Sequence, residues 1–166
     1  MNRTVFLITF FILISSSLTG CISNDSESDN IELTVQFAKT NGTIIKSFAD
    51  GELVSTENVI LNFNFDKTTS SSDLTIFGIE TNGEQYVTES DKNSEISIEF
   101  SSHGFYHLNA YAIDENENSK NTSIFVRIDS TVHWIESNTN NPEPVKIEPV
   151  PENNGKHPEM IDVFSR

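Results

Sequence analysis

Alternation of apolar and polar residues is the feature of this chain that most restricts its fold. In the stretch ENVILNFNFD, Val59, Leu61 and Phe63 fall on one side of an extended backbone, and Asn62 and Asn64 fall on the other. Successive side chains of a β-strand point to opposite faces, whereas a helix would scatter these residues around its axis. The pattern therefore predicts a strand with one buried face.

Other alternating stretches recur along the chain. They are LTVQF at 33–37, LTIFGIE at 74–80, SEISIEF at 94–100 and NTSIFVRID at 121–129. Turn signals separate them, among them Asn41-Gly42, Asp50-Gly51 and Asn82-Gly83. Such pairs supply the positive φ angles of tight hairpins. About seven short strands without a helical stretch predict an all-β fold, an antiparallel β-sandwich of the immunoglobulin-like kind.

Charge and cysteine content exclude several classes of protein. The 166 residues carry a formal net charge of -15. Binding to nucleic acid needs clustered Lys and Arg, so we expect no nucleic-acid partner. The acidic charge keeps an exposed protein soluble, with cation binding as the alternative. Because Cys21 is the only cysteine, no intramolecular disulfide can form, and stability must come from apolar burial.

The first 20 residues have the composition of a targeting segment. A basic start, Met1 to Arg3, precedes an apolar run at 5–14. This run is shorter than the roughly 20 residues that span a bilayer, but it suits the central region of a secretory signal. We therefore expect residues 1–20 to form a signal helix rather than part of the domain.

The sequence LTGC at 18–21 resembles the cleavage box of lipoprotein signal peptides. The resemblance implies that the chain is cut before Cys21, that Cys21 is acylated, and that the protein faces outward from the cell membrane, at the cell surface or in the periplasm. An ordinary secretory signal or an uncleaved anchor are the alternatives. Each buried methylene of an acyl chain contributes about 0.8 kcal/mol, so two chains hold a soluble domain on a membrane.

Composition divides the rest of the chain into three parts. Residues 21–31 have the acidic, Ser-rich composition of a flexible tether. Residues 32–136 carry the strand pattern of the sandwich. Residues 137–166 form a Pro- and Asn-rich tail that holds all five prolines, and its last stretch, EMIDVFSR, resembles the start of a further strand or domain.

A second resemblance covers GFYHLNAYAIDENENSKNTSIFVRI at 104–128, which is similar to the end of PKD-type, immunoglobulin-like surface domains. Gly104, Tyr106 and Asp114 match the pattern of that family, followed by a closing strand at 124–128. The resemblance implies a PKD-like sandwich. Tyr106 has its own physical explanation, because a tyrosine at such a corner packs its ring on the core and bonds nearby backbone through its hydroxyl.

The turn DENEN is the first candidate site. Asp114, Asn116 and Asn118 offer oxygens at alternating positions, which is how a loop wraps calcium. The turn lacks the Gly and the distal Glu of an EF-hand, and a solvated acidic hairpin is the alternative. His103 and His107 are about 13 Å apart on a strand, too far to share one ion. We therefore expect no metal or cofactor, with calcium as the alternative.

Trp134 is the second candidate site, because it follows the last expected strand in TVHWIES and an exposed tryptophan often anchors an interface. A structural role is the alternative. Asn24, Asn41 and Asn121 begin acceptor sequons for glycosylation on an exported chain.

No motif nominates a catalytic centre. No serine lies in Gly-x-Ser-x-Gly, and no glycine-rich phosphate loop is present. We expect a non-enzymatic, lipid-anchored protein that binds or adheres to an extracytoplasmic protein or polysaccharide. The alternatives are a structural spacer, an accessory subunit of an envelope or transporter complex, and a calcium-binding surface module.

Overall fold

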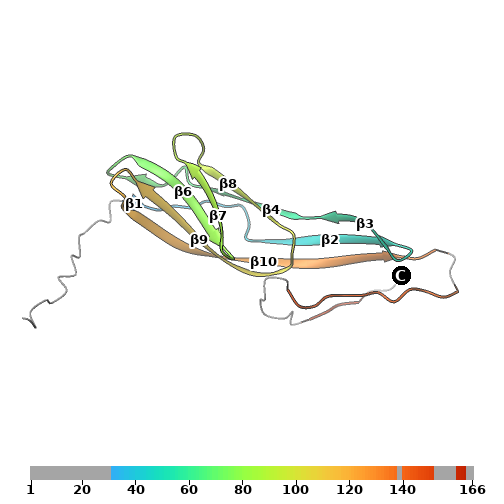
Figure 1. The fold of residues 1–166 in the computed structure, drawn as a ribbon. Coiled ribbons are helices and arrows are strands. Elements are labelled where there is room, and N and C mark those ends of the chain that lie inside the picture. The colour runs from blue at the N-terminus through green and yellow to red at the C-terminus, as the bar shows by residue number, and fades with distance from the viewer. Residues whose placement is uncertain (1–30, 138–139, 152–159, 164–166) are drawn as a thin grey trace, which may run out of the picture.

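The computed structural model describes residues 31–137, 140–151 and 160–163 (Figure 1). The signal helix expected at 1–20 lies outside them. These residues form ten strands and no helix: β1 (Ile31–Glu32), β2 (Asn41–Ala49), β3 (Glu52–Glu57), β4 (Val59–Asn64), β5 (Thr69–Ser70), β6 (Leu74–Thr81), β7 (Glu84–Glu89), β8 (Glu95–Phe100), β9 (Gly104–Asp114) and β10 (Ser119–Ile135).

The strands form a two-layer sandwich. One layer contains the pairs β4-β8 and β1-β5, and a bridge between Gln36 and Asn64 attaches the N-terminal segment to β4. The other layer is a six-stranded sheet in the order β3-β2-β10-β9-β6-β7. With β4 and β8 as strands B and E, and β6, β9 and β10 as strands C, F and G, this is the strand arrangement of an immunoglobulin-like sandwich. The predicted fold class is confirmed, with more strands than expected and one parallel pair, β2-β10.

The core lies between the two layers and comes from the predicted alternation. Phe63 and Leu61 of β4 are 0% and 1% exposed, and Ile98 of β8 is 1% exposed. Leu108 of β9 and Val126 of β10 are buried in the facing sheet. Each such side chain contributes roughly 1.5 to 3 kcal/mol when it leaves water. The core therefore needs no covalent crosslink to hold the layers together.

Tyr106 forms the corner that the sequence predicts. Its hydroxyl donates a hydrogen bond to the backbone oxygen of Ser102 over 2.6 Å. Its ring meets that of Phe100 edge to face, with 4.8 Å between the ring centres. The tyrosine thus ties the start of β9 to the loop before it.

Two local predictions are wrong. Residues 33–37 form no strand beyond the bridge at Gln36, because here the chain crosses from one layer to the other. Asn41-Gly42 is not a turn but the start of β2. Gly42 is required here by close packing, because a Cβ at this position would lie 2.4 Å from a methyl carbon of Val59 and clash with it.

Two other predicted turns are confirmed as hairpin turns. Asp50 and Gly51 have φ values of 50° and 85°, and Asn82 and Gly83 have values of 51° and 81°. Positive φ at both central positions is the mark of the turn whose twist matches paired strands.

A three-stranded arm extends beyond the sandwich (Figure 1). We define the arm as β3, residues 45–49 of β2 and residues 130–135 of β10. The sequence suggests a last strand ending near Asp129, yet β10 continues to Ile135 and pairs in parallel with β2 throughout the arm. The arm is a single layer, because the pair β4-β8 does not extend over it.

Candidate functional site

Trp134 lies within β10, on one face of the arm, and not beyond the last strand. It is paired in register with Phe48 of β2, and the two rings stack with their centres 5.2 Å apart. The indole N–H donates a hydrogen bond of 3.2 Å to Oε1 of Glu136. Trp134 is partly buried, so it organises the arm, and its role in binding stays a prediction.

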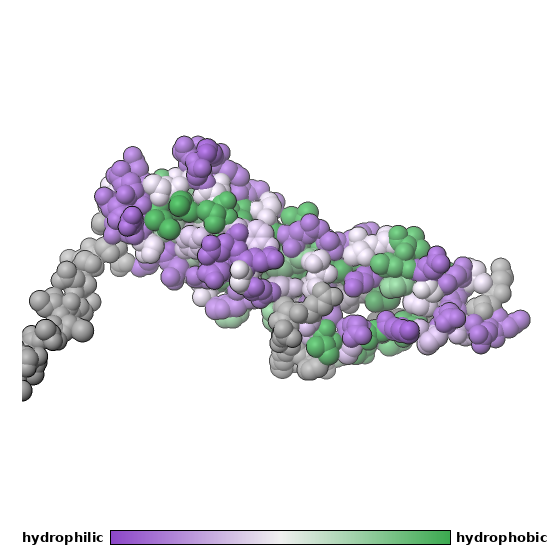
Figure 2. All heavy atoms as spheres, viewed as in Figure 1, coloured by the Kyte–Doolittle hydropathy of each residue, from purple (hydrophilic) through white to green (hydrophobic). Residues whose placement is uncertain are grey.

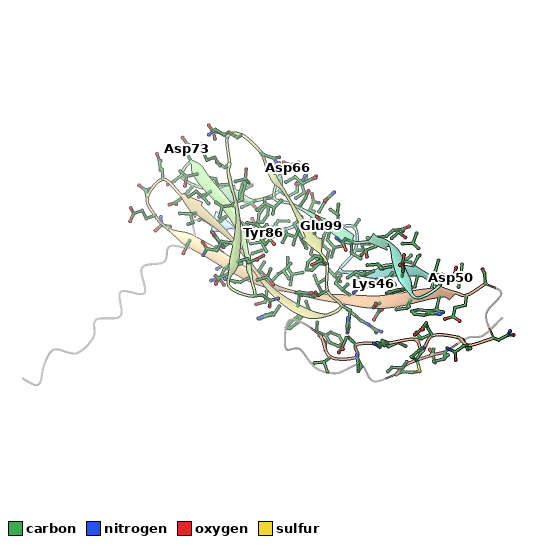
Figure 3. The ribbon with its side chains drawn as sticks, turned by 45° about the vertical axis from the view of Figure 1, so that its right-hand side comes forward. Lys46, Asp50, Asp66, Asp73, Tyr86 and Glu99 are labelled. Atoms are coloured by element: carbon green, nitrogen blue, oxygen red, sulfur yellow. The ribbon has the colours of Figure 1, made fainter. Side chains whose placement is uncertain are left out.

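The chain after β10 folds back along the arm. The backbone N–H of Ser137 donates to Oδ1 of Asp50 over 2.9 Å, and the N–H of Glu143 donates to Oε1 of Glu136 over 2.8 Å. Residues 140–151 then run beside the arm in both ribbon views, with Asp50 at the arm's far end (Figures 1 and 3). The Glu136 carboxylate therefore joins the indole of Trp134 to this returning segment.

Apolar side chains remain on the surface of the arm. Leu53 is 55% exposed, Val54 is 67% exposed and Ile135 is 64% exposed. Figure 2 shows apolar residues reaching the surface of the arm between charged ones. A single-layer sheet cannot bury both of its faces, so the arm offers apolar area for contact with another molecule.

The DENEN turn is held by its own aspartate. The buried carboxylate of Asp114 accepts the backbone N–H groups of Asn116 and Asn118, over 3.0 and 2.9 Å, and the side-chain amide of Asn118, over 2.9 Å. The amide of Asn118 and these backbone donors hold the pKa of Asp114 below its usual value.

The same turn contacts the loop before β6. The side-chain amide of Asn116 donates to the hydroxyl of Ser72 over 2.8 Å. Asn116 and Asn118, the two predicted asparagine ligands, thus donate N–H groups to protein oxygens. The hydrogen bonds of Asp114, Asn116 and Asn118 stabilise the turn and explain these residues without a metal ion. Calcium binding here stays a prediction.

The two histidines are not brought together with other ligands. His107 stacks on Phe125, with ring centres 4.7 Å apart. Across the described part of the chain, no group of three or more His, Cys, Asp or Glu residues is placed to hold a metal ion. The same residues contain no helix long and apolar enough to cross a membrane.

The remaining predicted sites lie on strands or outside the described residues. Asn41 and Asn121 are exposed, at the start of β2 and near the start of β10. Cys21 and Asn24 fall outside the ranges that the structure describes. Lipidation and glycosylation therefore stay predictions.

Comparisons with known proteins assign this chain to no family. No family model matches the chain, and no curated protein matches it. Among solved structures, it is similar to the Clostridium thermocellum CbhA fibronectin(III)-like modules, with 16% identity and a TM-score of 0.35 over 60% of this chain and 97% of that one. The observed strand order, and not this distant likeness, defines the fold.

Proposed function

We propose that the protein is a non-catalytic binding module anchored by lipid at Cys21 on the outer side of the cell membrane, with the arm as its contact surface. The observation that carries the anchoring is the sequence LTGC directly after an apolar run of signal-peptide length. The resemblance to lipoprotein signals supplies the chemistry, a thioether-linked acyl group at Cys21.

The position of the arm supports its role as the contact surface. The described chain begins with β1 at the end of the sandwich opposite to the arm (Figure 1). A domain tethered through residues 21–31 would therefore point its arm away from the membrane. Leu53, Val54 and Ile135 supply exposed apolar area there, and the stacked ring of Trp134 makes the arm rigid.

The chemistry of the chain favours a protein as ligand. A net charge of -15 repels nucleic acid and anionic lipid, whereas exposed aliphatic side chains on a sheet suit an apolar protein surface. A polysaccharide, the other expected ligand, would be bound mainly through hydrogen bonds and aromatic stacking, and Trp134 is already stacked on Phe48.

Metabolic labelling tests the anchor. A fatty-acid analogue should label the wild-type protein and the Ser16→Ala variant, whose cleavage box is intact, but not Cys21→Ser. Mass spectrometry of the native protein should find Cys21 acylated at the new N-terminus. A bare thiol, or a leader still attached, would contradict the anchoring proposal.

Site-specific crosslinking in intact cells tests the arm. A photo-reactive amino acid placed at Ile135 or Val54 should yield one defined adduct, whereas the same group at Val87, which is 53% exposed on β7 outside the arm, should not. Adducts of equal yield at all three positions would refute the arm as the contact surface. A structural spacer predicts no defined adduct from any of them.

A further inference from the structure

The first half of β10 has one free edge. Residues 119–128 of β10 pair with β9 on one side, but β2 joins the other side only from Arg127, whose N–H donates to the backbone oxygen of Thr40 over 2.9 Å. Among the described strands, none pairs with residues 119–126 on that side, although β1 passes close to β10. The backbone N–H and C=O groups of successive residues in a strand point to opposite sides. The N–H and C=O groups of Asn121, Ser123 and Phe125 therefore point to the same side as those of Arg127, which is the open side.

A groove with a mixed polar and apolar lining runs along this free edge. It has a volume of about 390 Å³ and lies between residues 33–40 and residues 122–125 of β10. The partly buried side chains of Leu33 and Val35 line it and pack against the core. A row of backbone donors and acceptors beside an apolar floor is the geometry that accepts an added strand.

Three other long free edges are guarded by acidic residues. Each carries two glutamates: Glu52 and Glu57 on β3, Glu84 and Glu89 on β7, and Glu95 and Glu99 on β8. The outer edge of β4 carries none, but residues 36–39 lie beside it and Gln36 pairs with Asn64 there. Charged residues on an edge oppose pairing with another strand, the more so in a chain of net charge -15. β3 also has a bulge opposite Ser47 and Phe48, which disrupts its ladder.

The edge at 119–126 carries charge of the opposite sign. It contains Lys120 and no acidic residue, and Lys39 and Arg127, the latter ion-paired with Asp129, lie at its end near β2. A positive edge opposes a basic strand and favours an incoming strand that is acidic.

The chain contains a segment with the matching chemistry. Residues 159–166, EMIDVFSR, combine Glu159 and Asp162 with apolar residues. In the described part of this segment, Met160, Ile161 and Val163 are 72%, 55% and 80% exposed. Three large apolar side chains within four residues are thus left in water. An extended backbone would place two of them, Ile161 and Val163, on one face.

We propose that residues 159–166 of one copy add as a strand to the free edge of β10, residues 119–126, in a second copy. Residues 160–163 lie beside the arm, away from the first half of β10 (Figure 1). This placement within their own molecule favours a second copy over the same one as the acceptor. Because the added strand and the edge that accepts it are different surfaces, the contact is head to tail, and it can repeat from one molecule to the next as a ring or an open chain.

Disulfide crosslinking between two variants tests the proposal in the full chain. Both carry Cys21→Ser, so the result does not depend on lipidation and cannot be confused with a failure of the anchoring proposal. One protein carries Ser123→Cys, and the other carries a single cysteine at 160, 161, 162 or 163. On mixing and mild oxidation we expect a disulfide-linked dimer from alternate positions only, since cross-strand cysteines bridge when their Cα atoms are about 4.4 to 6.8 Å apart.

Matched controls make the outcome decisive. Ser55→Cys on the guarded edge of β3 should give no dimer with the same partners. Ser123→Pro should abolish concentration-dependent association in sedimentation while circular dichroism keeps its strand signal, because the lost N–H faces the open side and not β9.

Several results would overturn the proposal. They are the absence of any mixed dimer, equal yields at all four positions, and a disulfide that closes only within one molecule when both cysteines are in the same chain. A mixed dimer from Ser55→Cys in yield equal to that from Ser123→Cys would also reject it.

Discussion

Replacing Tyr106 by Phe isolates the contribution of the tyrosine corner to stability. The change removes one oxygen and leaves the ring, which keeps its edge-to-face contact with Phe100. What is lost is the hydrogen bond from the hydroxyl to the backbone oxygen of Ser102, which is short at 2.6 Å.

The structure sets the size of the expected loss. A typical intramolecular hydrogen bond contributes about 0.5 to 1.5 kcal/mol, and a buried carbonyl left unpaired adds about 1 to 3 kcal/mol. Because Ser102 is partly exposed, we expect the second contribution to be small. We expect the free energy of unfolding to fall by about 1 to 2 kcal/mol, which lowers Tm by about 5 to 12 °C in a domain of this size.

Urea unfolding of both tyrosine variants provides the assay. Tyr106→Phe should lower the midpoint without changing the m-value. Tyr111→Phe is the matched control, because among the described residues the hydroxyl of Tyr111 has no hydrogen-bond partner, and its effect should stay within about 0.5 kcal/mol. If Tyr106→Phe leaves the free energy of unfolding unchanged, or if both variants lower it equally, the tyrosine corner is not a stabilising element.

Three further changes test the core, a turn and the aspartate latch. Phe63→Ala empties a fully buried site between the layers and should cost about 3 to 5 kcal/mol in urea unfolding; a loss below 1 kcal/mol would contradict the placement of the core. Gly83→Ala meets no atom within 4 Å, so its expected loss of about 1 kcal/mol comes only from the φ of 81°, and an unchanged Tm would show that the turn relaxes. Asp114→Asn should destabilise at neutral pH. Because folding lowers the pKa of Asp114, its contribution is complete above the usual aspartate value of about 4 and disappears as the pH falls through the lower folded value. The unfolding free energies of the wild type and Asp114→Asn should therefore converge at low pH. A difference that is constant with pH would show that the charge of Asp114 does not stabilise the turn.

Strands with one buried face could be read from the sequence. β4 and β8 supply the core through alternate residues such as Leu61 and Ile98, and each strand was predicted within a residue or two of its ends. The positive φ values at Asp50-Gly51 and Asn82-Gly83 were predictable for a similar reason, because the demand for them is local. Where burial or backbone geometry acts on neighbours in sequence, the pattern is visible without the fold.

The arm could not be predicted in this way. β3 is exposed along its whole length, so burial imposes no alternation on it. The end of β10 acquires its partner, β2, from a part of the chain more than 80 residues away, and in a parallel register that no local signal marks. The stacking of Trp134 on Phe48 follows from that register, which is why the sequence placed this tryptophan after the last strand and left open whether it anchors an interface or has a structural role.

The candidate sites also divide into those visible in the sequence and those visible only in the structure. The LTGC motif of Cys21 and the sequons of Asn41 and Asn121 are short contiguous patterns, so the sequence alone nominates them. The exposed apolar area of the arm and the free edge of β10 exist only once distant strands are paired or left unpaired. The sequence by itself determined the sandwich, its buried faces and the hairpin turns at Asp50-Gly51 and Asn82-Gly83, because each depends on the chemistry of neighbouring residues. Only the tertiary structure decided which strand edges are covered and which apolar side chains stay in water, because those outcomes depend on segments that meet across the whole length of the chain.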